Sequence, residues 1–253
     1  MALIICTECG KEFSDRAVAC PNCACPTVVI LQELKAAQGK VSGGAKNRLP
    51  IFAGTFFEFG RWPYEEDGDI KPIRWKVFAL LQRQNLAILV SENIIDAKPF
   101  NSSFEDITWH TSTVGKWLNT TFLNQAFTRD EQSVMINPFE NDDSFWRVFL
   151  PTSADLQNMF PEIEQRLCNV TPYARRNGVW TDAMTGCGPW WLQNVIGGRY
   201  ATAVKPDGQC EVGTGIAVDY GDIGVRPIIV LSYTPVGQGD GEFGYSGVVV
   251  KRP

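Results

Sequence analysis

The chain has little of two features that mark common functional classes. It contains a single histidine, His110, among 253 residues, so a Ser-His-Asp or Cys-His catalytic arrangement would have to use that residue. His110 lies just before a predicted helix, where we expect it to cap or pack. Positive charge is also not in surplus, because 23 Lys and Arg stand against 28 Asp and Glu, for a net charge of −5. We therefore expect no general nucleic-acid binding, which needs clustered Lys and Arg.

Long hydrophobic runs are missing as well. The longest, such as residues 28–31 and 78–81, are far shorter than the roughly 18 residues of a membrane helix, so no membrane span is expected. The first residues carry neither a basic leader nor a long apolar core, which predicts no secretory signal and a cytoplasmic location. In a reducing compartment, the eight cysteines are best interpreted as thiols and metal ligands.

Aromatic and other apolar residues are plentiful. Hydrophobic residues make up 44% of the chain, including fifteen Phe and eight Trp. A chain of this length and composition can bury a sizeable core built from aromatic rings. We expect one large domain with a small appendage.

Two cysteine pairs near the N-terminus form the strongest local motif. Cys6 and Cys9 are followed, after ten residues, by Cys20 and Cys23. Each pair can place two thiolates on one turn, and two such turns close a tetrahedral four-sulfur site that suits Zn²⁺. Cys25 competes for the fourth position, although the two-residue gap favours Cys23. Four protein ligands leave no open coordination position, so the expected zinc ion is structural.

Changes in composition divide the chain into four segments. Residues 1–26 hold the cysteine pairs, and residues 27–49 combine a helix-forming stretch with a Gly-rich linker. Residues 50–233 are predicted to form the main domain. Residues 234–253 are a Gly-rich tail whose last apolar residues either pair at a sheet edge or stay free.

The main domain combines strand and helix patterns. Strands are predicted at residues 51–63, 75–78, 86–90 and 147–150, and again through residues 190–232 with a hairpin turn at Asp207 and Gly208. Apolar residues at helical spacing follow a capping Thr111 or Ser112. Two further helices are predicted, one after Thr128 in a capping box with Glu131 and one after Thr152 or Ser153.

Segments along the whole main domain resemble, in the same order, an uncharacterised bacterial family. They are WKVFALL, LAILVSE, TWHTSTVGKWLNTTF, AFTRDE, RVFLPTSAD, GPWWLQN, ATAVKPDGQCEVG and GVRPIIVLS. Members of that family look like C-type lectin folds and often carry an N-terminal zinc ribbon, which ICTECGKEFSDRAVACPNCACP resembles. The resemblance implies an α+β fold, with a C-type-lectin-like mixed sheet and two or three flanking helices after a small zinc ribbon. Formylglycine-generating enzymes and the variable proteins of diversity-generating retroelements share this general fold.

The resemblance also implies that ligand contacts come from the C-terminal half. Eight positions match the exposed, diversified positions of retroelement variable proteins, and Trp191 is added because aromatic side chains carry much interface energy. The predicted ligand-binding residues are Trp191, Asn194, Arg199, Tyr200, Thr202, Glu211, Asp219, Tyr220 and Asp222. Arg226, in the motif GVRP, is expected to be structural and to donate hydrogen bonds to carbonyls or a carboxylate.

The predicted function is binding without catalysis, in which the C-type-lectin-like scaffold presents a surface to an unknown protein or small-molecule ligand. One form of this hypothesis is a retroelement variable protein. One alternative is an oxidative enzyme of the formylglycine-generating type, which would need reactive thiols among Cys168, Cys187 and Cys210. Another is a structural subunit that docks into an assembly through its zinc ribbon.

Calcium is a second candidate ion. Acidic groups at residues 140–143, 219–222 and 240–242 offer loop oxygens for Ca²⁺. None of them has the graded spacing of a dedicated calcium loop, so solvated loop charge is the favoured interpretation.

Overall fold

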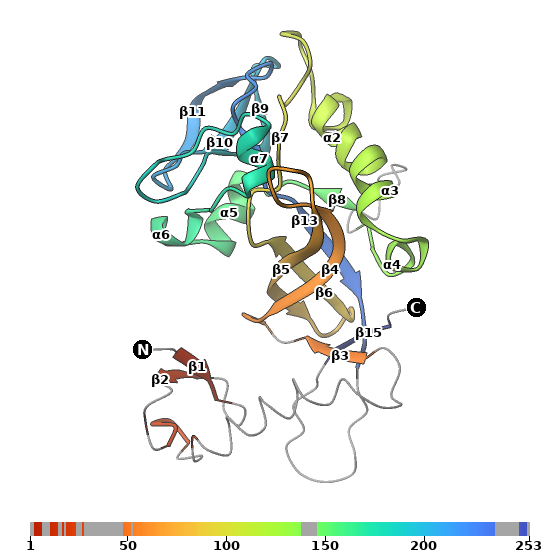
Figure 1. Ribbon diagram of the computed structural model, residues 1–253, viewed down its shortest axis with the longest axis vertical. Helices are drawn as coiled ribbons and strands as arrows, with labels where there is room; N and C mark the ends of the chain where they lie inside the picture. The colour runs from red at the N-terminus through yellow and green to blue at the C-terminus, as the bar shows by residue number, and fades with distance from the viewer. Residues whose placement is uncertain are drawn as a thin grey trace. The chain divides into compact units, whose positions relative to one another are not determined.

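The chain divides into two compact units, Met1–Lys46 and Asn47–Pro253, and each is described by itself (Figure 1). The computed structural model describes residues 3–6, 11–14, 17, 19–23, 27, 48–51, 53–137, 146–235 and 248–251. The helix predicted within residues 28–38 lies outside these ranges.

The first unit contains a short hairpin. Strands β1 (Leu3–Ile5) and β2 (Glu12–Ser14) pair antiparallel, with Ile4 opposite Phe13. Its described core consists of Cys6, Phe13 and Cys20, packed against Ile4 and Ala17. The described part of this unit buries few apolar side chains, and a unit with so small a core commonly needs a metal ion or disulfides.

The first sheet of the second unit is wholly antiparallel. Its order is β4 (Phe56–Pro63), β5 (Ile70–Leu81), β6 (Leu86–Ser91), β13 (Ile228–Ser232) and β8 (Val148–Phe149). The hairpin predicted from residues 75–78 and 86–90 is confirmed, with Val77 opposite Leu89. Alternate residues of β5, namely Ile73, Trp75 and Val77, are buried, as the period of a half-buried strand requires.

The second sheet is mixed. Its order is β11 (Cys210–Ala217), β10 (Tyr200–Val204), β9 (Trp190–Ile196), β12 (Gly224–Val225) and β7 (Asp96–Ala97). β12 runs parallel to β9, while the other pairings are antiparallel. The predicted hairpin turn lies between β10 and β11, where Gly208 takes a φ of +83°. Since β12 belongs to this sheet and β13 to the first, the short segment between them joins the two sheets.

The C-terminal tail contributes one strand. β15 (Val248–Lys251) pairs antiparallel with β3 (Arg48–Ile51) and with β14 (Thr234–Pro235). Of the two alternatives for the end of the tail, the structure therefore has the paired one.

The described helices of the second unit are η1 (Trp109–Thr111), α2 (Thr113–Trp117), η2 (Leu118–Phe122), α3 (Leu123–Ala126), α4 (Arg129–Ser133), α5 (Ser153–Met159), α6 (Ile163–Arg166) and α7 (Pro172–Arg176). Helices α2, α3 and α4 lie along one side of the second unit, whereas α5, α6 and α7 lie away from them (Figure 1). The predicted caps are confirmed, because Ser112, Thr128 and Thr152 each accept a hydrogen bond from an amide in the first turn. Among the described residues, no helix combines the length and apolarity needed to cross a membrane.

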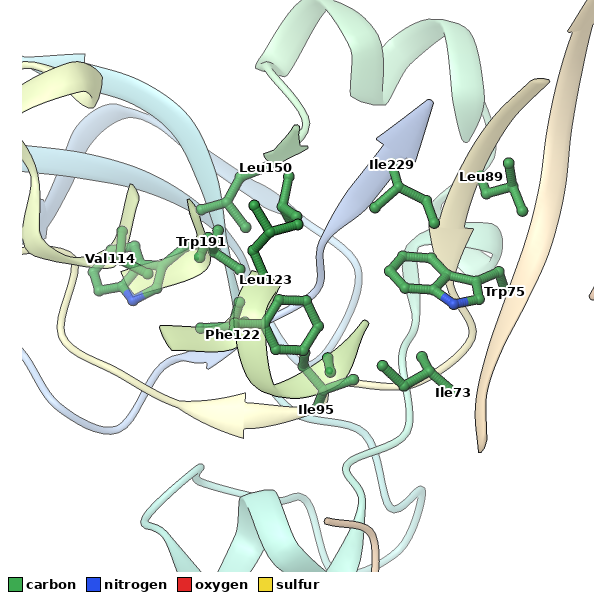
Figure 2. Packing of buried hydrophobic residues seen from close by; sticks show 14 of the residues in the cluster. Ile73, Trp75, Leu89, Ile95, Val114, Phe122, Leu123, Leu150, Trp191 and Ile229 are labelled. Carbon is green, nitrogen blue, oxygen red and sulfur yellow. The ribbon is translucent and has the colours of Figure 1, made fainter. Parts of the chain in front are cut away.

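One core joins the sheets to the helices. Figure 2 shows Phe122 and Ile95 near its middle, with Trp191 on one side and Trp75 on the other. The Phe122 ring lies edge-on to Trp62, with centroids 4.9 Å apart. The indole nitrogens of Trp75 and Trp191 both have hydrogen-bond partners. Trp75 Nε1 donates to Phe59 O and Trp191 Nε1 donates to Lys98 O, at 2.7 and 2.8 Å. The α+β class is thus confirmed, and the C-type-lectin-like assignment stays a prediction.

Two strand predictions were wrong in extent. The strand predicted over residues 51–63 is interrupted, because Ala53 and Gly54 form a turn with a φ of +84° at the glycine. The strand predicted over residues 147–150 has only two residues. Asn119 Oδ1 accepts the amides of Arg147 and Val148, at 2.7 and 3.0 Å, so a helix side chain takes the place of a second neighbouring strand.

Gly60 gives a test of this packing. It has a φ of +69°, and a Cβ there would lie 2.4 Å from the Phe127 ring. We expect Gly60→Ala to lower the free energy of unfolding by about 2–4 kcal/mol, because it adds a clash to backbone strain. Gly68→Ala is the control, since Gly68 has a φ of +89° but open space around it. Urea unfolding followed by tryptophan fluorescence measures both, and equal losses would contradict the packing.

Candidate functional site

Three cysteines of the first unit lie close enough to share a metal ion. The sulfurs of Cys6, Cys20 and Cys23 are all within 4.8 Å of one another, and those of Cys6 and Cys23 are 3.4 Å apart. Tetrahedral zinc with Zn–S bonds of about 2.3 Å separates its sulfurs by about 3.8 Å, so this spacing fits. Cys9 and Cys25 lie outside the described residues, and the identity of the fourth ligand stays a prediction.

The fold positions these thiols by local means. Cys6 follows β1 directly, and its amide donates to Lys11 O at 2.9 Å, which closes the turn into β2. Cys6 and Cys20 are each 1% exposed, while Cys23 is exposed. Two buried sulfurs and one at the surface can hold an ion at the edge of the small core. The donor set is soft, which favours zinc over calcium or magnesium.

Calcium finds less support. Within the described ranges, the three cysteines are the only group that brings three or more His, Cys, Asp or Glu side chains together, so no third carboxylate lies beside Asp219 and Asp222. Residues 140–143 and 240–242 lie outside these ranges.

A second candidate site lies beside the turn between β9 and β10, where three loop segments are joined by backbone hydrogen bonds. Asn101 N donates to Val218 O at 2.7 Å, and Val218 N donates to Arg199 O at 3.1 Å. Ile107 N donates to Gly198 O at 2.8 Å. The segments 101–107, 197–199 and 218–222 therefore hold one another in place.

Exposed side chains of these segments and their neighbours form what we call the rim surface. It consists of Phe104, Asp106, Trp180, Arg199, Tyr200, Asp219, Tyr220 and Asp222. Trp180 joins it because its amide donates to Asp222 O at 3.1 Å. The four aromatic residues are 42–51% exposed, so each is anchored by about half of its surface and presents the rest to solvent.

One cluster within the rim surface is ordered by its own contacts. Arg199 Nε donates to Asp106 Oδ1 at 2.7 Å, and the guanidinium lies 5.6 Å from the centre of the Phe104 ring. The Phe104 and Tyr200 rings meet edge to face at 5.8 Å. An exposed ion pair of this kind stabilises the fold little. Its main effect is to fix the orientation of the arginine and the two rings.

The charge of the rim surface is negative. Its three carboxylates, from Asp106, Asp219 and Asp222, outnumber the single guanidinium of Arg199, which leaves a net charge of −2. Because these groups are exposed, the surface attracts positive partners at low salt and less so at high salt.

The structure brings five of the nine predicted ligand-binding residues together on the rim surface: Arg199, Tyr200, Asp219, Tyr220 and Asp222. Trp191 and Thr202 do not belong to the rim surface. They are 0% and 2% exposed, so a ligand at the surface cannot contact their side chains. The Trp191 ring packs in the main core, edge-on to Phe100 at 5.6 Å, and Thr202 Oγ1 donates to Asn194 O at 3.3 Å.

The last two predicted residues lie elsewhere. The Asn194 side chain accepts hydrogen bonds from Ser153 N and Oγ, at 2.7 and 3.1 Å, and so holds the start of α5. Glu211 lies in β11 opposite Ala203, and its side chain is outside what the structure describes.

Three rim residues were missed by sequence reasoning: Phe104, Asp106 and Trp180. Phe104 did carry a signal, because it is the only apolar residue in the run NSSFED. A large apolar residue in such a polar loop is either a local anchor or an exposed contact, and the pattern alone does not distinguish them. Asp106 carried no signal, since its partner Arg199 is 93 residues away.

Of the groups considered for catalysis, His110 is packed against a ring, Cys168 and Cys187 are buried, and Cys210 is partly buried in β11. The His110 ring packs on Trp146, with centroids 5.2 Å apart. Cys168 and Cys187 lie on adjacent segments, because Asn169 pairs with Cys187. They are only 2% and 6% exposed, and burial raises the pKa of the Cys168 thiol to about 11. A thiol held protonated is a poor nucleophile.

The fold and these sites define an α+β domain that presents interlocked loops, together with a separate unit that can bind a metal ion. A family model described as "Domain of unknown function (DUF6273)" matches residues 84–233. This is more than half of the chain, which therefore belongs to the DUF6273 family. The match contains the whole rim surface, whereas the cysteine unit, β4 and β5 precede it. No curated protein and no solved structure matches the chain significantly.

The metal centre can be tested by metal analysis of purified protein. We expect about one zinc ion per chain, and its loss in Cys20→Ser, because that variant removes a buried ligand. Cys210→Ser is the control, since Cys210 lies in β11.

All eight tryptophans lie at or after Trp62, so tryptophan fluorescence reports the second unit alone. Chelation should leave its melting temperature unchanged, and a large shift would contradict two independently folded units.

Proposed function

We propose that the chain is a non-enzymatic binding protein whose rim surface recognises a protein partner that carries basic side chains. The observation that carries this proposal is the ordered, exposed cluster of Phe104, Arg199 and Tyr200, held by Asp106 on interlocked loops. Loops positioned by a rigid scaffold are a common location of binding residues.

The residue types support recognition of a protein. Trp, Tyr and Arg are enriched among the residues that contribute most to protein–protein binding, and the rim surface has one Trp, two Tyr and one Arg. Tyr200, Tyr220 and Trp180 offer large contact area with few rotatable bonds, so little side-chain entropy is lost on binding. Their partial burial reduces that loss further, because the rings are already restrained.

The charge supports a basic partner. The carboxylates of Asp219 and Asp222 flank Tyr220 in the sequence, so an incoming Lys or Arg could meet both a negative charge and an aromatic face. Cation–π contacts and charge complementarity add to each other in such an arrangement. The chain's overall charge of −5 would also speed the encounter with a positive partner.

Structural zinc in the first unit is part of the same proposal. We assign its ligands to Cys6, Cys9, Cys20 and Cys23, because three of these thiols are already grouped and the fourth completes a closed tetrahedral set. Such a site would stabilise the small unit without taking part in a reaction.

The oxidative-enzyme alternative has one observation in its favour, the proximity of Cys168 and Cys187. Against it stand their burial and the raised pKa of the Cys168 thiol, both of which oppose attack on a substrate. A retroelement variable protein remains one specific form of the binding hypothesis. A retroelement variable protein would show sequence variation at the exposed rim positions.

Site-specific cross-linking tests the proposal. A photoreactive phenylalanine analogue at Tyr200, introduced in cells of the source organism, should form a covalent adduct with a partner protein. The same analogue at Phe56 is the matched control, because Phe56 is 48% exposed and outside the rim surface. We expect Tyr220→Ala to weaken the adduct at position 200 and to change stability by less than about 1 kcal/mol. Equal amounts of adduct at positions 56 and 200, or no adduct at position 200, would contradict the proposal.

A further inference from the structure

A pocket of about 510 Å³ opens between the β4–β5 hairpin and two loops, at residues 92–95 and 169–171. It shares no residue with the rim surface. Its size lies in the range of sites that hold a small molecule or a few residues of peptide.

Backbone hydrogen bonds hold the three walls together. Glu92 N donates to Arg74 O at 2.9 Å, which joins the first loop to β5. Ile94 N donates to Asn169 O at 2.9 Å, which joins the two loops. Tyr173 N donates to Tyr64 O at 2.9 Å and so ties α7 to the end of β4. The pocket is thus preformed, and a ligand would not have to order its walls.

One wall carries a row of three charged residues. Glu58 lies opposite Arg74 in the β4–β5 register, and Arg74 Nη1 is 2.9 Å from Glu92 Oε2. Two carboxylates beside one guanidinium leave an excess negative charge at this wall, while Lys71, the other cation of the lining, is paired with Glu65 outside it. Such a wall attracts a cationic group and repels phosphate or a second carboxylate.

Two side-chain amides in the pocket are open. Within the described part of the chain, the Asn93 side chain makes no hydrogen bond, and Asn169 uses only its Oδ1, which accepts from Cys187 Sγ at 3.7 Å. Each carboxamide offers donors and an acceptor side by side. This is the pattern that pairs with the N–H and C=O groups of a peptide backbone.

The aromatic residues of the pocket argue against a sugar. Sugars bind on open ring faces, but Trp62 is only 7% exposed. The Tyr64 face is covered by Lys71, whose Nζ lies 5.0 Å from the ring centre. A ligand here must rely on charge and amide hydrogen bonds.

We infer that this pocket binds the free amino terminus of a short extended peptide. The α-ammonium group meets the carboxylates of Glu58 and Glu92, the first peptide groups pair with Asn93 and Asn169, and the chain runs toward Lys71. Arg74 and Lys71 are three positions apart in β5, which is about 10 Å along the strand. About three extended residues of a ligand span the same distance.

Calorimetric titration with two synthetic peptides tests the inference. The amide Ala-Ala-Ala-NH₂ should bind, and its N-acetylated form should bind at least about tenfold more weakly, because it lacks the cationic amine. No binding of the free-amine peptide at about 10 mM, or equal binding of both forms, would overturn the inference.

Substitutions locate the binding. Glu92→Gln and Asn93→Ala should each weaken binding of Ala-Ala-Ala-NH₂ by about fivefold or more, since each removes one contact. Glu164→Gln is the matched control, because Glu164 is exposed in α6 and does not line the pocket. Tryptophan fluorescence melting checks that each variant is folded. Unchanged binding in both pocket variants would place the peptide elsewhere and overturn the assignment.

Discussion

One buried cation holds the two sheets of the second unit together. Arg226 lies in the short segment between β12 and β13, where the chain passes from one sheet to the other, and it is 4% exposed. Its guanidinium is 4.8 Å from the centre of the Phe160 ring and 4.9 Å from that of Trp190, and its Nε donates to Ser91 O at 3.2 Å. Because arginine keeps its charge when buried, these ring faces and the carbonyl must offset its desolvation.

The position of the rim surface follows from this arrangement. Trp190 and Trp191 begin β9 from opposite faces of the sheet: Trp190 packs on Arg226, while Trp191 donates to Lys98 O and fixes the start of the segment that leads to Phe104. The buried side chains thereby set the backbone, and the loops beyond them expose Tyr200 and Tyr220. Because the buried side chains set the backbone and the exposed ones form the rim surface, rim side chains can change with little effect on the fold.

Local signals made much of the fold predictable. The caps Ser112, Thr128 and Thr152 and the β5–β6 hairpin depend on neighbouring residues, and the structure has them as expected. The site was predictable only in part. Adjacent Trp190 and Trp191 are both buried because β9 is covered on both faces. The apolar pattern of a single strand does not show whether one or both of its faces are covered. Asp106 and Arg199 meet only through the fold, so nothing in their local sequence marked the pair.

Binding through the rim surface requires that its loops are held in one geometry before any partner binds. Hydrogen exchange of the native protein tests it most directly, because the amides of Asn101, Ile107, Trp180 and Val218 donate across loops. We predict that these four amides exchange at least about 100-fold more slowly than in an unstructured chain. Exchange at the unprotected rate would contradict it, since the exposed aromatic residues would then share no fixed surface.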